Sequence, residues 1–120
     1  MIKQKKILII DDNELLKEVI ADYLSSLNAV ILMAADGKEG FMTTEAERPD
    51  IIITDMTMHG GSGIEMLNKI SLLANYKPKV FVTTGVMDLN IEEFKKFNVI
   101  KIFEKPFDSK IFINTISSYL

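Results

Sequence analysis

Cysteine is missing from the 120 residues, histidine occurs once, and positive charge is not in excess. Without cysteine there is no disulfide framework, thiolate zinc site or cysteine nucleophile, which makes the reducing cytoplasm the natural compartment. Lysine and arginine number 14 against 17 aspartates and glutamates, and no basic run occurs, so we expect this domain not to bind nucleic acid directly. The single histidine, His59, has no second histidine beside it and is interpreted as a loop residue.

Long hydrophobic runs are also missing. After the lysines of the first six residues, the apolar stretch covers only residues 7–10, which is too short for a signal peptide. A membrane-spanning helix needs about 20 apolar residues, and no segment approaches that length, so we expect no membrane contact. With 48% hydrophobic residues and no repeats, the chain is predicted to form one domain over residues 1–120 with a substantial core.

Short apolar runs alternate with segments whose apolar residues recur at helical spacing. The runs are predicted to be strands buried on both faces, at 7–10, 30–33, 51–54, 80–82 and 100–103. The intervening segments predict helices over 13–27, 38–47, 64–70, 91–97 and 108–120, the last capped by Asp108. Such alternation requires right-handed crossovers and helices on both faces, so the fold class is α/β with a doubly wound parallel sheet.

Polar residues follow directly on these strands: Asp11, Asp12, Asp55, Thr83 and Lys105. In doubly wound sheets, sites form outside the carboxyl ends of the strands, so these side chains should converge. Three carboxylates gathered there would repel one another, and a bound cation is the simplest account of the cluster. Hard oxygen ligands point to Mg²⁺, which prefers octahedral coordination at about 2.1 Å and keeps several waters.

The identity and spacing of these residues resemble the receiver domain of two-component response regulators. The resemblance covers essentially all 120 residues. It rests on Asp11-Asp12 after the first strand, Asp55 after the third, Thr83, Lys105-Pro106-Phe107, Asp36-Gly37 and Gly63. It implies a CheY-like (βα)5 domain of the flavodoxin-like class, with a five-stranded parallel sheet in the order 2-1-3-4-5.

The resemblance also implies a phosphorelay chemistry. Asp55 would take a phosphoryl group from a phosphohistidine on a histidine kinase or a histidine phosphotransfer protein. Asp12, Asp55 and the backbone carbonyl of Thr57 would hold Mg²⁺, with Asp11 acting mainly through water. The metal would neutralise charge on the group being transferred.

Two further residues would turn phosphorylation into a signal. By the resemblance, Lys105 would pair with a phosphoryl oxygen, and Thr83 would swing its hydroxyl toward another and reposition the loop 83–89. The family presents the change to a downstream effector or output domain on the face of its fourth helix, fifth strand and fifth helix. Pro106 would follow a cis bond, as in the family. Such a protein assists its own phosphorylation and dephosphorylation but is not a turnover enzyme.

The sequence departs from the family at two positions. Ile102 stands three residues before the lysine, where the family usually has an aromatic, although Phe103 is adjacent. His59 stands where the family commonly has proline. Thr57 occupies the place at which the family tunes the lifetime of the phosphoryl group.

Other readings of the same residues stay open. Taken singly, Asp11 and Asp12 could cap a helix. A haloacid-dehalogenase-like phosphatase would need a second aspartate two residues after the nucleophile, where this chain has Thr57. A flavodoxin-type cofactor binder would need a hydroxyl-rich and glycine-rich loop after the first strand, where acid would repel the flavin phosphate. A receiver that acts only as a docking module, independently of phosphate, is the strongest alternative.

Overall fold

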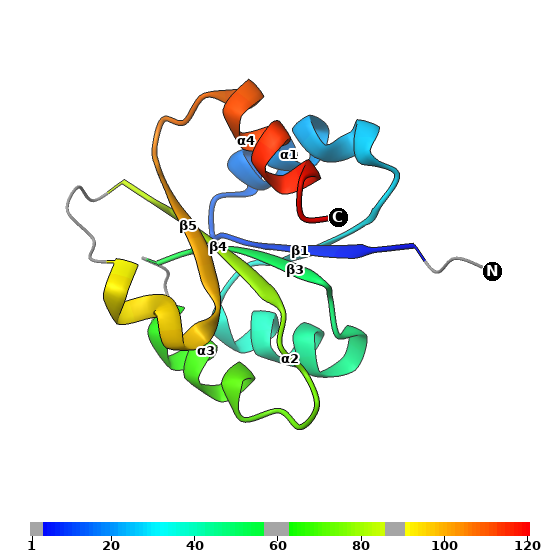
Figure 1. The fold of residues 1–120 in the computed structure, drawn as a ribbon. Helices are drawn as coiled ribbons and strands as arrows, with labels where there is room; N and C mark the ends of the chain where they lie inside the picture. Colours follow the sequence, from blue (N-terminus) through cyan, green and yellow to red (C-terminus); the bar gives the residue numbers. More distant parts are fainter. Residues whose placement is uncertain (1–3, 57–62, 86–90) are drawn as a thin grey trace.

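Residues 4–56, 63–85 and 91–120 are described by the computed structural model, and within them five parallel strands form one sheet (Figure 1). The strands are β1 (Lys6–Ile10), β2 (Val30–Ala34), β3 (Ile51–Asp55), β4 (Lys79–Thr84) and β5 (Val99–Glu104). Their order is β2-β1-β3-β4-β5, which confirms the predicted doubly wound topology. Each apolar run picked out in the sequence lies inside one of these strands.

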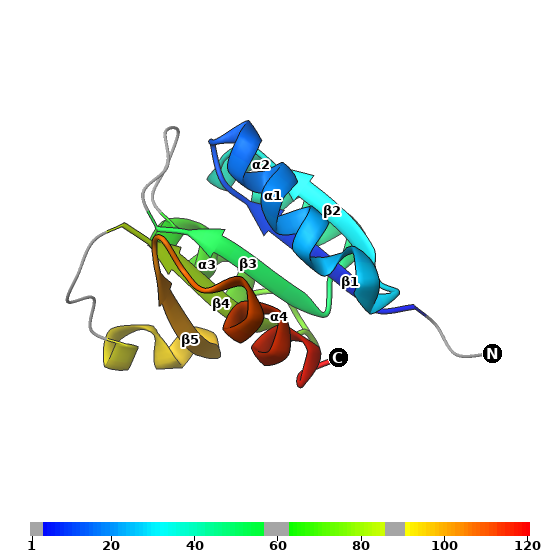
Figure 2. The ribbon, with the colours of Figure 1, turned by 90° about the horizontal axis from the view of Figure 1, so that it is seen from above.

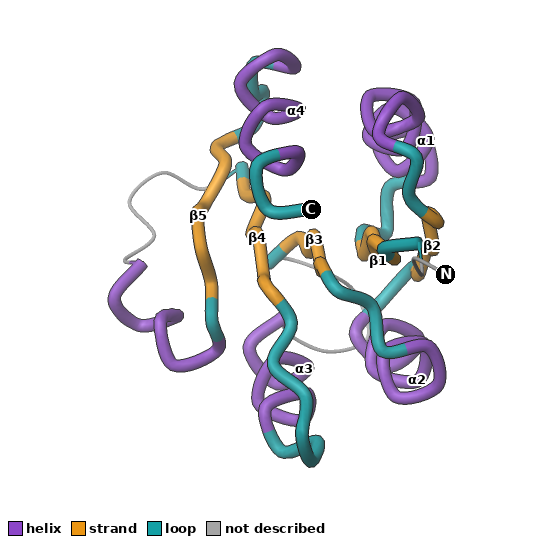
Figure 3. Tube along the Cα trace, turned by 45° about the vertical axis from the view of Figure 1, so that its right-hand side comes forward, coloured by secondary structure: helices purple, strands orange, loops and turns teal. Residues whose placement is uncertain are grey.

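Helices cover both faces of the sheet. Figure 3 shows α1 (Glu14–Leu24) and α4 (Ser109–Ser117) on one side of the strands, and α2 (Gly37–Glu47) and α3 (Gly63–Ser71) on the other. Alternate residues along a strand point to opposite faces, so each strand supplies two cores. Ile7 and Ile9 pack toward α1 and α4, whereas Leu8 and Ile10 pack toward α2 and α3. Burial on both faces explains why the strands are apolar throughout.

Two of the predicted helices contain 3₁₀ geometry. The fourth predicted helix is present as η2 (Ile91–Phe97) and is a 3₁₀-helix. Its sequence carries the reason, because Ile91, Phe94 and Phe97 recur every three residues, the period of a 3₁₀-helix. The first helix ends at Leu24 and continues as a short 3₁₀ turn, η1 (Ser25–Leu27).

Helices α1, α2 and α4 begin at side-chain caps. Asn13 accepts a hydrogen bond from the backbone N–H of Leu16, and Asp36 caps α2 in the same way. Asp108 accepts from Ile111, which confirms the predicted cap of the last helix, although α4 ends at Ser117 rather than at the end of the chain. Each of these caps lies two to four residues beyond the end of a strand, so it marks where the chain turns from the sheet into the next helix.

An irregularity in the last strand pair decides which side chains of β5 face which core. Val80 pairs with Val99, but Phe81 pairs with Lys101, so Ile100 is an extra residue in β5. After this bulge Phe103 joins the core beneath α1 and α4, and Ile102 packs on the α3 side. Phe103 therefore does not replace the missing aromatic at position 102.

Figure 2 shows the strands running away from the side on which both termini lie, so their carboxyl ends gather at the far edge. The sheet order reverses between β1 and β3, since β1 pairs with β2 on one side and β3 on the other. Ligand sites in open α/β sheets form at this reversal. Across the described ranges, every helix is too short or too polar to cross a lipid bilayer.

Candidate functional site

Three aspartates meet at the carboxyl ends of β1 and β3. Asp11 and Asp12 directly follow β1, and Asp55 is the last residue of β3. One carboxylate oxygen from each lies within 4.8 Å of the others. Asp11 is only 1% exposed and Asp55 only 6%, whereas Asp12 is open to solvent. The predicted convergence of these carboxylates is confirmed.

Lys105 reaches this cluster from the segment after β5. Its Nζ lies 3.2 Å from Oδ2 of Asp11 and 3.4 Å from Oδ2 of Asp55. Its backbone N–H donates to the carbonyl of Thr84 at 2.7 Å, which anchors the segment to the end of β4. The Lys105-Pro106 peptide bond is cis, as predicted. One ammonium against three carboxylates leaves these four side chains with a formal charge of −2.

Asp11 is fixed by contacts on both of its oxygens. Oδ1 accepts a hydrogen bond from the backbone N–H of Asn13 at 2.9 Å, while Oδ2 faces Lys105. The backbone N–H of Asp11 donates to the carbonyl of Ala34. The cap of α1 is Asn13, so the reading of Asp11 and Asp12 as a helix-capping pair is wrong. Asp12 is the most accessible carboxylate of the cluster.

Thr83 lies on the strand next to Asp55. The two residues are register partners in β3 and β4, and Thr83 is buried. The backbone N–H of Met56 donates to the carbonyl of Thr83 at 3.3 Å, which continues the pairing one residue beyond β3. Neighbouring strands are about 4.8 Å apart, so a hydroxyl at this position is within one side chain of Asp55. Thr57, His59 and most of the loop 83–89 lie outside the described residues.

The donor set of the cluster fits Mg²⁺. Carboxylate oxygens are the hard ligands that this ion prefers, and an open edge leaves room for its retained waters. Two oxygens bound to one octahedral ion at about 2.1 Å lie roughly 3.0 to 4.2 Å apart. The spread of up to 4.8 Å among the three aspartates is therefore closed by small side-chain movements. Asp11, Asp12 and Asp55 are the residues of the described chain that could hold such an ion.

A groove beside Lys105 was not anticipated from the sequence. It has a volume of about 340 Å³ and lies between α1 and the segment after β5, lined by Leu16, Val19, Tyr23, Lys105, Pro106 and Phe107. Leu15, on the first turn of α1, is 70% exposed. Leu16, Val19 and Tyr23 belong to the predicted helix over 13–27, and helical periodicity alone does not separate the rim of an apolar face from its centre.

Comparison with protein families gives one match across most of the chain. The model of the response regulator receiver domain matches residues 7–117. This span includes all of the residues described in the acidic cluster and Lys105.

Individual relatives are similar over nearly their whole length or over only one part. The chain is 28% identical to sporulation initiation phosphotransferase F of Bacillus subtilis, covering 97% of this chain and 94% of that protein. It is 27% identical to the polar-differentiation response regulator DivK of Brucella anthropi, covering 97% and 96%. In the Regulator of RpoS of Escherichia coli, 26% identical over 85% of this chain, the match spans only 30% of the relative.

Solved structures agree with the fold. The chemotaxis response regulator CheY4 of Vibrio cholerae superposes with a TM-score of 0.84 at 22% identity, covering 98% of this chain and all of that one. The signal receiver domain of a LuxO repressor protein from Vibrio parahaemolyticus gives a TM-score of 0.87 at 20% identity, covering 98% and 90%. At these identities the likeness concerns the arrangement of the backbone.

Proposed function

The chain belongs to the family of response regulator receiver domains, phosphoacceptor switches of two-component signalling, and we propose that Asp55 is the residue that accepts the phosphoryl group. The observation that carries this proposal is the meeting of Asp11, Asp12 and Asp55 with the ammonium of Lys105 3.4 Å from Asp55. We also propose that residues 1–120 act as one receiver domain and that it works in the cytoplasm, where histidine kinases present their phosphohistidines.

In the proposed step an oxygen of Asp55 attacks the phosphorus of a phosphohistidine on a partner kinase or phosphotransfer protein. The oxygen–phosphorus bond forms as the phosphorus–nitrogen bond breaks, and the partner's imidazole leaves with the electron pair. Asp12 and Asp55, with the carbonyl of Thr57 that the family resemblance implies, would hold Mg²⁺, which would neutralise charge on the group in transfer. Asp11, whose Oδ1 is held by the backbone N–H of Asn13, would act on the ion through water.

Lys105 and Thr83 would then register the new group. A phosphoryl group adds roughly −1.5 to −2 charges and strong acceptor oxygens. Lys105 would exchange its 3.4 Å contact with the Asp55 carboxylate for a shorter and stronger charge-assisted bond to a phosphoryl oxygen. Thr83, on the neighbouring strand, would donate its hydroxyl to another oxygen and carry the change into β4.

The readout by effectors is proposed to use η2, β5 and α4. The aromatic that the family usually carries is Ile102 here, half-buried on the α3 side, while Phe103 is buried on the other side of the sheet. We therefore propose that this face responds through movement of the backbone and of Ile102 rather than by rotation of an aromatic ring. The proposed partner at this face is a downstream effector protein or an output domain.

The chain is not proposed to be a turnover enzyme on small substrates. A phosphatase of the haloacid-dehalogenase type would need a second carboxylate two residues beyond the nucleophile, where this chain has Thr57. The switch instead assists its own phosphorylation and dephosphorylation.

Incubation with Mg²⁺ and acetyl phosphate tests the proposal. Intact-mass spectrometry is expected to show one added phosphoryl group in the wild type and none in Asp55→Asn. Asp50→Asn is the matched control, since Asp50 is exposed at the opposite end of β3 and should leave the added mass unchanged. An unchanged wild-type mass with acetyl phosphate and with phosphoramidate would favour a docking module. Multiple turnover of a phosphomonoester would favour the phosphatase.

A further inference from the structure

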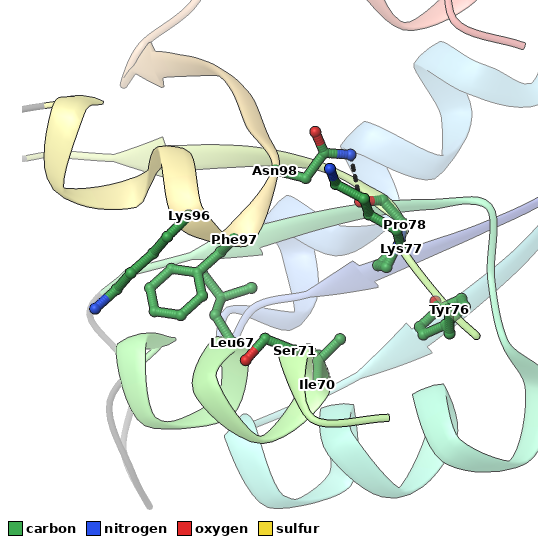
Figure 4. Close-up of a pocket in the computed structure, with 9 residues that line it drawn as sticks. All are labelled: Leu67, Ile70, Ser71, Tyr76, Lys77, Pro78, Lys96, Phe97 and Asn98. Carbon is green, nitrogen blue, oxygen red and sulfur yellow. Dashed lines mark hydrogen bonds between the residues drawn. The ribbon is translucent and has the colours of Figure 1, made fainter. Parts of the chain in front are cut away.

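A second concave feature lies at the amino-terminal ends of β4 and β5, far from the acidic cluster. It is a pocket of about 230 Å³ between the end of α3, the segment before β4 and the end of η2 (Figure 4). Its apolar walls come from Leu67 and Ile70 of α3, Pro78 and Phe97. The receiver chemistry uses none of these residues.

The walls of the pocket are tied to one another by hydrogen bonds. Asn98 donates its side-chain amide to the carbonyl of Pro78 at 3.0 Å, a bond drawn in Figure 4. Tyr76 donates its hydroxyl to the carbonyl of Pro49 at 2.6 Å. These bonds hold the segment before β4, which forms one wall of the pocket, against Asn98 and Pro49.

Positive charge flanks the apolar floor. Lys77 and Lys96 both line the pocket, and Figure 4 shows them on opposite sides of the ring of Phe97. The ammonium of Lys96 lies 5.0 Å from the centre of that ring. Arg48 stacks over the ring of Tyr76, also a lining residue. Asp50 is an acidic residue close to Tyr76, and its Oδ2 accepts a hydrogen bond from the backbone N–H of Lys6.

We propose that this pocket binds a segment of a partner protein in which one large apolar side chain is flanked on both sides by aspartate or glutamate. Pockets for small ligands usually enclose about 300 to 1,000 Å³, and this smaller one suits a single anchoring side chain. A lysine at each end matches a segment with acid on both sides of its anchor.

Nuclear magnetic resonance titration of the whole unphosphorylated chain, without Mg²⁺, tests the proposal. The probe is a short synthetic peptide with a central phenylalanine between runs of glutamate. Saturable shifts are expected at the methyl groups of Leu67 and Ile70. Replacing the central phenylalanine by alanine should weaken binding about tenfold, because the anchor supplies most of the contact. A peptide flanked by lysine should produce no saturable shift.

Two variant pairs localise the effect. Lys96→Ala should weaken binding by about fivefold and reduce its salt dependence, whereas Lys95→Ala should not, since Lys95 pairs with Glu92 and does not line the pocket. Ser71→Trp should block the pocket, whereas Leu72→Trp places the same bulk on an exposed neighbour outside the pocket lining.

Three outcomes would overturn the proposal. These are equal binding of the alanine peptide, binding of phenylacetate in place of the acidic peptide, and shifts that depend on protein concentration in the absence of peptide. The last two would assign the pocket to a small carboxylate and to a second copy of this chain. Because the titration uses neither Mg²⁺ nor a phosphoryl donor, its failure leaves the role of Asp55 untouched.

Discussion

Lys105 joins two carboxylates that would otherwise face each other across the site, since its ammonium contacts both Asp11 and Asp55. In Lys105→Ala with Mg²⁺, we expect beryllofluoride to bind but to shift the backbone amides of β5 and α4 much less than in the wild type. The reason is that the phosphoryl mimic loses the donor that links it to the segment after β5. Two-dimensional ¹⁵N spectra measure the shifts. Lys101→Ala, which changes an exposed lysine of β5, is the control, and wild-type shifts in Lys105→Ala would contradict the assigned role.

Tyr76 gives a residue-scale prediction about pH. Burial raises the pKa of its hydroxyl above the usual 10.0, with Asp50 adding to the rise and Arg48 opposing it. The folded state therefore keeps this proton where the unfolded state loses it, and its contribution to stability declines as pH rises above 10.0. Tyr76→Phe removes the bond to Pro49 and should lower the free energy of unfolding by about 1 kcal/mol near neutral pH.

The difference between wild type and Tyr76→Phe should shrink at strongly alkaline pH, because phenylalanine does not titrate. Urea unfolding on each side of the ordinary tyrosine pKa measures it. Tyr23→Phe is the comparison variant. It also removes a tyrosine hydroxyl, but from a ring that packs edge-on against Phe112 and takes no part in the bond to Pro49. A difference that stays constant or widens with pH would contradict the assignment.

At the scale of elements, the sequence predicts strands better than helix type. A strand buried on both faces must be apolar at every position, and this requirement shows directly in residues 7–10 and 51–54. Helical spacing over a short segment is less decisive, since a repeat of three residues in η2 fits a 3₁₀-helix as well as one face of an α-helix. The site residues were predictable because parallel strands bring their carboxyl ends together.

The groove between α1 and the segment after β5 carries a prediction about the phosphoryl donor. It adjoins Lys105, and its apolar lining with the exposed Leu15 suits the surface of a partner that must bring a phosphohistidine to Asp55. Leu15→Ser should slow transfer from a phosphorylated histidine phosphotransfer protein severalfold, because apolar contact area is lost. Labelling by acetyl phosphate should be unchanged, since that donor needs no docking surface.

Phosphoryl transfer followed by radiolabel or mass would measure this effect. Leu72→Ser is the matched control, because Leu72 is exposed to a similar degree but follows α3 and does not line the groove. Equal slowing of both variants would indicate a general effect on the protein. Slowing of acetyl phosphate labelling in Leu15→Ser would place Leu15 in the chemical site instead.

At the scale of the whole molecule, the carboxyl ends of the strands collect acid and the amino ends collect base. Asp11, Asp12 and Asp55 stand at one pole, while Lys77 and Lys79 precede or begin β4 at the other. The acidic pole was predictable because each aspartate directly follows its strand. The pocket at the basic pole was not, since its walls come from α3, the segment before β4 and η2, and no local pattern marks such a meeting of distant segments.

If the acidic pole binds Mg²⁺ as proposed, folding stability should depend on the ion. An ion that binds the folded chain alone stabilises it by about 2.7 kcal/mol at a hundredfold excess over its dissociation constant, which should raise the unfolding temperature by roughly 10 °C. Asp12→Asn removes one ligand and one repulsive charge, so this variant should unfold at a higher temperature than the wild type without Mg²⁺ and gain little when the ion is added. Differential scanning calorimetry measures both effects.

Asp22→Asn, exposed on α1 outside the cluster, should keep the wild-type response. The same Mg²⁺ response in Asp12→Asn as in the wild type would mean that the ion binds elsewhere, because these clustered carboxylates are the ligands from which the stabilisation is derived.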